Sequence, residues 1–213
     1  MDNQLLHQYI LDHSEPEDPF LYQLYRATNI HTVHGRMASG HLQGVLLKMF
    51  VEMLQPKNIL EVGTFSGYSA IAMAKGLKEG AMIHTYEIND EMEDFTRPWI
   101  EGSPVADKID FRIGDAAEEA PKLGILFDMA FVDGDKRTYA EMYEKLLPII
   151  RPGGYILADN TLWDWHVIDP TYDHDHQTIG IRRFNDLIAK DKRVEKVILP
   201  LRDGLTLIRK KPG

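Results

Sequence analysis

The 213-residue sequence contains no cysteine. This absence excludes a disulfide framework, a thiolate metal site and a cysteine nucleophile together. The sequence also has no apolar run long enough to cross a bilayer, and its polar, acidic first residues are unlike a signal peptide. We therefore expect a cytoplasmic protein with no membrane partner.

Positive charge is scarce. Lysine and arginine number 24 against 33 aspartates and glutamates, which gives a formal net charge of −9. A dedicated nucleic-acid binder needs positive charge to offset a phosphate backbone, so we expect no nucleic-acid partner and favour small-molecule chemistry. The length suits one α/β domain over residues 1–213, with a helical extension over about residues 1–54.

The GxGxxG spacing of dinucleotide-binding turns is also missing. The stretch NILEVGTFSGYSAIAMAKGL predicts a strand over Asn58–Val62 and a helix over Tyr68–Leu77, joined by a GxxxG turn. Gly63 and Gly67 would give this turn backbone freedom and room for a close ligand. The spacing disfavours a nicotinamide dehydrogenase and suits a ligand without phosphates, although any α/β protein can have such a turn. With Glu61 before it, the turn resembles the first motif of class I S-adenosylmethionine (AdoMet) methyltransferases.

Two further strands are expected to end in acidic residues. The strand Met82–Tyr86 ends at Glu87, and the strand Ile109–Ile113 is soon followed by Asp115 and Ala116. In a doubly wound sheet, an acidic residue after the second strand accepts hydrogen bonds from ribose hydroxyls. Asp115 can accept from an adenine amine while the next backbone N–H reaches a ring nitrogen, but it is also suited to capping the following helix.

Oxygen ligands follow the next two strands. Phe127–Val132 leads to Asp133, and Tyr155–Ala158 leads to Asp159 and Asn160. The spacing makes these strands neighbours, so the three side chains should converge at the carboxyl edge of the sheet. Three hard oxygen donors suit Mg²⁺, with Mn²⁺ or Ca²⁺ as alternatives, better than zinc. The competing interpretation is that they cap helices and turns.

The remaining pattern predicts helices and a hairpin. Apolar stripes predict two helices before residue 41 and a third over His41–Leu54. A long helix is expected over Arg137–Ile150, ended by a turn at Arg151–Gly154. The Asp-Gly turn between Val194–Pro200 and Leu205–Arg209 predicts a hairpin with an antiparallel last strand.

The irregular segment Thr161–Thr178 contains Trp163, Trp165 and Tyr172. Exposed aromatic residues next to an active edge predict a lid over an organic substrate. The run Asp173–His176 alternates aspartate and histidine, which allows metal binding but fits a solvated loop better.

Five motifs occur in the order found in one family: EVGTFSGYSA, YEIN, FVDGDKRTY, GGYILADNTLW and LPLRDGLTL. The chain resembles the metal-dependent caffeoyl-CoA and catechol O-methyltransferases over nearly its whole length. The resemblance implies a Rossmann-like seven-stranded sheet in the order 3-2-1-4-5-7-6, the last strand antiparallel, with helices on both faces. It also implies AdoMet as cofactor, one divalent cation, a small phenolic substrate and a homodimer.

The resemblance assigns roles to particular residues. Those implied to contact AdoMet are Met37, Glu61, Gly63, Thr64, Phe65, Tyr68, Ser69, Glu87, Asp115, Ala116 and Asp133. Those implied to hold the metal are Asp133, Asp159 and Asn160. Lys136 matches the general base and acts with Asp133 in catalysis, and Lys136 and Trp163 are expected to contact the substrate.

The chemistry is consistent with these roles. A phenol has a pKa near about 10, so it attacks a sulfonium methyl poorly unless it is ionised. Chelation of two adjacent oxygens by a divalent cation favours the anion. A lysine with an ordinary pKa near about 10.4 becomes an effective base only if a neighbouring cation and burial lower that pKa.

The acceptor stays open between a small catechol and a caffeoyl-CoA-like thioester. The segment Thr161–Thr178 has four aspartates and neither lysine nor arginine, which disfavours a polyanionic coenzyme A tail and favours free catechols. A non-catalytic AdoMet-binding protein would not be expected to retain the metal ligands and Lys136 together. The Asn/Asp-Pro-Pro-aromatic motif of N-methyltransferases is absent after the fourth strand.

Overall fold

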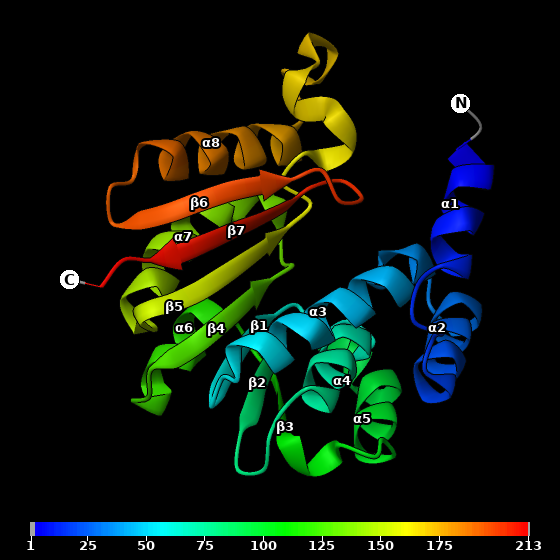
Figure 1. The fold of residues 1–213 in the computed structure, drawn as a ribbon. Helices are drawn as coiled ribbons and strands as arrows, with labels where there is room; N and C mark the ends of the chain where they lie inside the picture. Colours follow the sequence, from blue (N-terminus) through cyan, green and yellow to red (C-terminus); the bar gives the residue numbers. More distant parts are fainter. Residues whose placement is uncertain (1–2, 213) are drawn as a thin grey trace.

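The computed structural model describes residues 3–212 and has one seven-stranded sheet with helices on both faces (Figure 1). The ends of the expected domain, residues 1, 2 and 213, lie outside the described residues. The strand order is β3-β2-β1-β4-β5-β7-β6, as the resemblance implied. β7 runs antiparallel to both of its neighbours, so the predicted hairpin and antiparallel last strand are confirmed. The strands are β1 Asn58–Val62, β2 Met82–Glu87, β3 Ile109–Ile113, β4 Phe127–Val132, β5 Ile150–Asp159, β6 Val194–Leu199 and β7 Leu205–Lys210.

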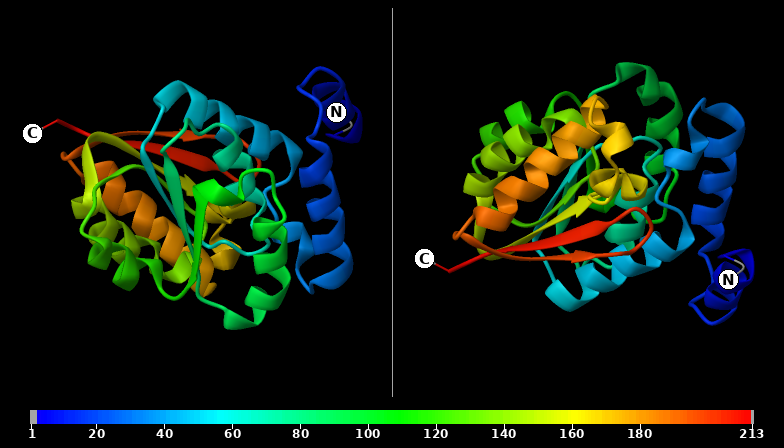
Figure 2. Two further views of the ribbon diagram at one scale, coloured as in Figure 1. Left: turned by 90° about the horizontal axis from the view of Figure 1, so that it is seen from below. Right: turned by 90° about the horizontal axis from the view of Figure 1, so that it is seen from above.

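Helices form a layer on each face of the sheet, as the two end-on views show (Figure 2). Helices α2 to α5 pack on one face, and α6 to α8 pack on the other. The α-helices are α1 Asn3–Asp12, α2 Pro19–His31, α3 His41–Leu54, α4 Tyr68–Lys75, α5 Glu93–Glu101, α6 Ala116–Glu119, α7 Tyr139–Leu146 and α8 His176–Lys190. None of the helices in residues 3–212 has both the length and the apolar character needed to span a bilayer.

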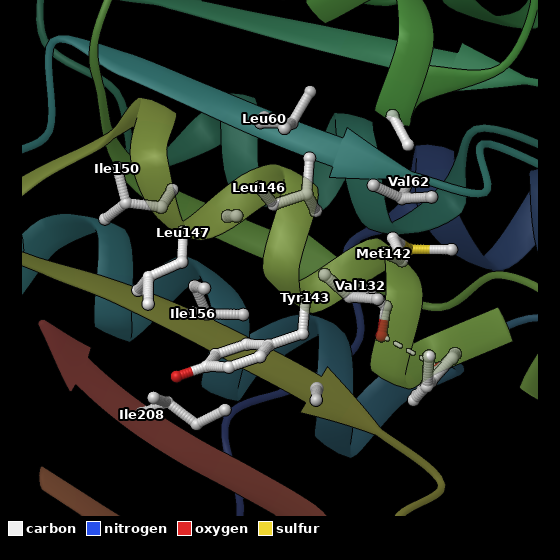
Figure 3. Close-up of a cluster of buried hydrophobic side chains, with 14 of the residues drawn as sticks. Leu60, Val62, Val132, Met142, Tyr143, Leu146, Leu147, Ile150, Ile156 and Ile208 are labelled. Carbon is white, nitrogen blue, oxygen red and sulfur yellow. Dashed lines mark hydrogen bonds between the residues drawn. The ribbon is translucent and has the colours of Figure 1, made fainter. Parts of the chain in front are cut away.

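Two hydrophobic cores lie on opposite faces because the side chains of each strand alternate. On β1, Leu60 and Val62 belong to the core beneath α7, whereas Ile59 belongs to the core beneath α3 and α4. Figure 3 shows the first core, where Leu146 and Tyr143 of α7 meet the strand side chains. Burial on both faces explains why the central strands β1 and β4 are mostly apolar.

Two predictions for residues 137–154 were wrong. The helix expected over Arg137–Ile150 is a 3₁₀ turn over Lys136–Thr138, then α7, then a second 3₁₀ turn over Leu147–Ile149. Pro148 lacks the N–H that a continuing α-helix needs. The turn expected at Arg151–Gly154 is an irregularity inside β5, because Phe127 pairs with Ile150 and Met129 with Tyr155.

The N-terminal helices support the sheet from one side. Asp18 caps α2 by accepting hydrogen bonds from the backbone N–H groups of Phe20 and Leu21, at 3.0 and 3.2 Å, and Pro19 occupies the first turn. Both α3 and α2 pack against α4. α1 leaves its apolar residues Leu5 and Tyr9 exposed.

Candidate active site

A cleft of about 1530 Å³ opens at the carboxyl ends of the parallel strands. β1 has β2 on one side and β4 on the other, so the strand order reverses here, which is where open α/β sheets bind ligands. The volume exceeds the roughly 300–1,000 Å³ of a typical small-molecule pocket. The predicted site residues that line it are Met37, Gly63, Phe65, Glu87, Asp115, Ala116, Asp133, Lys136, Asp159, Asn160 and Trp163. Those that do not line it are Glu61, Thr64, Tyr68 and Ser69.

The turn after β1 depends on glycine because the protein itself crowds it. Gly63 has φ +92, and a Cβ at this position would collide with the backbone carbonyl of Asp133. A Cβ on Gly67 would lie 3.1 Å from Ile100 of α5. The glycines therefore allow β1, β4 and α5 to approach one another, rather than only making room for a ligand.

Glu61 is completely buried below this turn. Its carboxylate accepts hydrogen bonds from Thr85 and Ser69, and Thr85 is in turn bonded to Thr64 at 2.6 Å. Burial raises the pKa of Glu61 to about 7, with these hydrogen bonds acting in the opposite direction. Its Oε1 atom has no hydrogen-bond partner among the described residues. Three of the predicted cofactor contacts, Glu61, Thr64 and Ser69, therefore form one buried polar cluster.

Glu87 presents a fixed carboxylate at the end of β2. One of its oxygens accepts from the backbone N–H of Phe65 at 2.7 Å, and the other accepts from the N–H of Asn89 at 2.9 Å. The side chain is nearly buried but borders the cleft. Each carboxylate oxygen retains a lone pair, so Glu87 can accept two further hydrogen bonds from a ligand.

At the end of β3, Asp115 caps the following helix and also borders the cleft. Its side chain accepts from the N–H of Ala117 at 2.9 Å and so caps α6. Asp115 and Ala116 also line the cleft. The cap fixes the carboxylate at the cleft wall and leaves its second oxygen without an intramolecular hydrogen bond among residues 3–212.

Tyr68, which the resemblance assigned to the cofactor, does not line the cleft. Its ring is almost fully buried beside Gly44 of α3 and packs edge-on against Tyr25, with ring centroids 6.1 Å apart. Its hydroxyl donates to Glu17 at 2.7 Å. Tyr68 therefore fastens the N-terminal helices to α4.

Lys136 is buried at the start of the 3₁₀ turn after β4. Its Nζ donates to Asp133 Oδ1 at 2.6 Å and lies 6.0 Å from the centroid of Trp163. Burial by itself lowers the pKa of Lys136, but Tyr139 and the nearby carboxylates outweigh it, so the pKa is raised. In the protein alone, Lys136 is thus held as a charged ammonium, whereas base catalysis needs a lowered pKa.

Helix α8 holds this turn in place. A Cβ on Gly180 would lie 2.7 Å from Arg137 Cα and would also collide with the carbonyl of Lys136. Tyr139 donates to the carbonyl groups of Val132 and Asp159, at 3.1 and 3.2 Å, and so joins the ends of β4 and β5.

Asp159 and Asn160 each have a partner that fixes their side chain. Gln43 of α3 donates to Asp159 Oδ2 at 2.7 Å, and Asn160 donates through Nδ2 to Asp203 Oδ2 at 2.8 Å. Burial raises the pKa of Asp159 to about 7, and the negative charge of Asp133 adds to that rise. The amide orientation of Asn160 leaves its Oδ1 available as an oxygen donor.

Sequence reasoning missed three residues of this site: Gln43, Arg202 and Asp203. Gln43 is buried in α3, and Arg202 and Asp203 lie in the β6–β7 turn, which had been interpreted only as a hairpin. No local pattern predicts contacts between residues so far apart in sequence. The motif LPLRDGLTL, which contains Arg202 and Asp203, was the available signal for two of these residues.

Of the aromatic residues in the segment 161–178, Trp163 is the one that lines the cleft. Tyr172 stacks on His166, with ring centroids 3.5 Å apart, and Trp165 is 54% exposed. Arg182 of α8 donates to the carbonyl groups of His166, Val167 and Asp169. The segment is therefore bound to α8 and projects beyond the sheet (Figure 1). It contributes Trp163, Asp164 and Gln177 to the lining of the cleft.

No group of three or more His, Cys, Asp or Glu side chains suited to a metal ion is found in residues 3–212. The set expected from the sequence has two aspartates, Asp133 and Asp159, and takes its third oxygen from the amide of Asn160.

The sheet order and the cleft with its acidic strand ends define a Rossmann-like methyltransferase fold. A family model described as O-methyltransferase matches residues 11–211, and the chain belongs to this O-methyltransferase family. Tricin synthase 2 of Oryza sativa subsp. japonica is 37% identical over 226 residues, covering 99% of this chain and 76% of that protein. Caffeoyl-CoA O-methyltransferase 2 of Zea mays is 36% identical over 220 residues, covering 96% and 82%.

Solved structures agree with this assignment. An O-methyltransferase from Bacillus cereus in complex with SAH superposes with a TM-score of 0.87 at 30% identity, over 97% of each chain. The O-methyltransferase TomG from Streptomyces achromogenes, involved in tomaymycin synthesis and solved in complex with SAM, gives a TM-score of 0.89 at 28% identity, over 99% of each chain.

Proposed function

We propose that this O-methyltransferase transfers the methyl group of AdoMet to a hydroxyl of a small catechol, with a divalent cation at Asp133, Asp159 and Asn160. The observation that carries the proposal is a pair of carboxylates at adjacent strand ends, of which Asp159 is buried and Asp133 is partly buried. Asp133 raises the pKa of Asp159, so the two negative charges repel each other in the protein alone. A cation between such groups would remove that repulsion.

The cleft fits AdoMet. Glu87 keeps two lone pairs for ribose hydroxyls, and Asp115 and Ala116 border the same cleft at the next strand end, where the adenine is proposed. Met37 and Phe65 line the part proposed for the methionine portion. The structural relatives in complex with SAH and SAM support the assignment of this cofactor.

The donor set fits Mg²⁺, with Mn²⁺ or Ca²⁺ as alternatives. All the donors are hard oxygens, and the bond from Asn160 to Asp203 presents the amide oxygen rather than its nitrogen. A divalent cation bound there would favour the ionised form of an acceptor hydroxyl, whose ordinary pKa is near about 10.

Lys136 is proposed as the group that accepts the acceptor's proton at Nζ. Its ion pair with Asp133 stabilises the ammonium form, so proton acceptance requires Asp133 to be engaged elsewhere. Trp163, whose ring faces Lys136, provides an aromatic wall for the acceptor.

A caffeoyl-CoA-like thioester is the second candidate acceptor, because relatives with 36% identity are named caffeoyl-CoA O-methyltransferases. The acidic segment 161–178 favours the small catechol instead. A homodimer is proposed as well, supported by the exposed apolar face of α1, and analytical ultracentrifugation tests it.

The test is mass-spectrometric detection of methylated products from a panel of free catechols, flavonoids and caffeoyl-CoA, with AdoMet and Mg²⁺. We expect catechol methylation that EDTA abolishes, and loss of turnover in Asp159→Ala while calorimetry still detects AdoMet binding. Full activity in excess EDTA contradicts the cation, and methylation of caffeoyl-CoA alone contradicts the acceptor.

A further inference from the structure

The β6–β7 turn brings an arginine to the cleft. Arg202 lines the cleft together with Asp159, Asn160 and Trp163. Its backbone has φ +52, a left-handed conformation that non-glycine residues rarely adopt. The turn is held at this place because the backbone carbonyl of Asp203 accepts hydrogen bonds from the backbone N–H groups of Leu162 and Trp163, at 2.8 and 2.9 Å.

One edge of the Arg202 guanidinium is anchored and the other is free. Its Nη1 donates to the carbonyl of Ser39 and to Gln43 Oε1, while Gln43 donates to Asp159 Oδ2 at 2.7 Å. Within residues 3–212, neither Nε nor Nη2 of Arg202 has a hydrogen-bond partner. The Arg202 guanidinium is thus connected through the Gln43 amide to Asp159, a proposed metal ligand. Its Nε and Nη2 groups remain available to a ligand.

Arg202 differs in this respect from most cations at the cleft. Three other lysines and arginines that line the cleft are paired with carboxylates: Lys136 with Asp133, Arg137 with Asp135, and Lys145 with Glu118. Arg36 also lines the cleft without an ion pair among the described residues, but no hydrogen bond connects it to a proposed metal ligand. Among the described residues, no carboxylate lies within ion-pair distance of Arg202. The neighbouring Asp203 carboxylate is engaged by Asn160.

We propose that Arg202 binds a carboxylate on the methyl acceptor, so that the preferred acceptors are catechols with an acidic substituent. This inference rests on the proposed function, because it requires the catechol hydroxyls to lie at Asp159 and Asn160. Two hydrogen bonds through the Gln43 amide connect Asp159 to the guanidinium, so the cation lies near the proposed metal site. An anchored guanidinium binds a carboxylate through two parallel hydrogen bonds with little further loss of side-chain freedom.

The preference for an acidic acceptor has to come from its direct contact with Arg202. Asp164 lines the same cleft, and the protein is acidic as a whole, so the long-range field does not favour an anion. A phosphate of a coenzyme A thioester offers the same anionic chemistry as a carboxylate, and the experiment has to separate the two.

The experiment compares 3,4-dihydroxybenzoate with its neutral isostere 3,4-dihydroxybenzamide, and includes caffeoyl-CoA as a third substrate. In the wild type we expect kcat/KM to be higher for the acid than for the amide. In Arg202→Gln the acid-to-amide ratio should fall roughly tenfold or more, the range expected for a charge-assisted hydrogen bond. The dissociation constant of the acid in the complex with SAH and Mg²⁺, measured by calorimetry, should rise in parallel.

The amide serves as an internal control, because any disturbance of Gln43 and Asp159 affects both substrates. Arg137→Gln removes the same charge from an arginine that already pairs with Asp135, and the ratio should not change. An unchanged ratio in Arg202→Gln, an equal fall in Arg137→Gln, or a fall confined to caffeoyl-CoA overturns the inference. If the wild type methylates neither benzoate nor benzamide, the proposed function fails instead.

Discussion

Replacing Glu61 with glutamine removes a buried carboxyl group while nearly preserving its size. Burial raises the pKa of Glu61 from its ordinary 4.5 to about 7 in the folded protein. Between pH 4.5 and about pH 7, Glu61 keeps a proton in the folded protein that it has released in the unfolded chain. Stability from this group is therefore present at low pH and is lost as pH rises towards about 7.

The magnitude follows from the shift. One proton held only by the folded state changes the free energy of unfolding by about 1.4 kcal/mol per pH unit. From about pH 5 to about pH 7, the wild type should lose on the order of 2 to 3 kcal/mol relative to Glu61→Gln. The pKa of Asp159 is raised in the same sense, but Asp159 is present in both proteins and cancels in the comparison.

Urea unfolding followed by tryptophan fluorescence, over a series of pH values with EDTA and without cofactor, measures this difference. The exposed Glu101→Gln at the end of α5 is the matched control and should keep the wild-type dependence on pH. If Glu61→Gln shows the same slope as the wild type, Glu61 does not retain a proton in the folded state and the reasoning fails.

Four other substitutions test the site. Asp203→Ala releases the Asn160 amide and should weaken Mn²⁺ binding by calorimetry roughly 10- to 100-fold, and unchanged affinity would show that this bond does not orient the ligand. Glu87→Gln should weaken AdoMet binding by roughly 1.5–3 kcal/mol, and an equal dissociation constant would refute the ribose contact. Lys136→Ala should lower turnover far more than AdoMet affinity and remove one limb of the pH–rate profile; identical profiles would contradict its role as base. Gly180→Ala should lower stability in urea by about 1–3 kcal/mol, because its Cβ collides with the backbone of Lys136, and full stability would show that α8 can move away.

The central strands were predictable because they are mostly apolar and buried on both faces. The bounds expected for β1, β3 and β4 match the structure to the residue. The start of β5 was not predicted, because Pro152 and the two following glycines are strong turn residues. The pairing of Phe127 with Ile150 and of Met129 with Tyr155 keeps this irregular stretch inside the strand.

The site was predictable where it depends on strand ends. Glu87, Asp133 and Asp159 follow parallel strands, and the topology alone brings such residues to one edge. The contact of Gln43 with Asp159 joins residues 116 positions apart, and no periodicity indicates it. Tyr68 had the right motif position, but its helix turns the side chain towards Glu17 and away from the cleft.

The position of β7 between β5 and β6 has a consequence for biosynthesis. Chains are made from the N-terminus, so β5 emerges from the ribosome with an open edge that stays unpaired until β7, the last strand, is made. Exposed edges invite pairing with other chains. The same late hairpin carries the turn that holds Asn160 and Gln43 in place. A nascent chain stalled before Leu205 would therefore be both inactive and prone to aggregate.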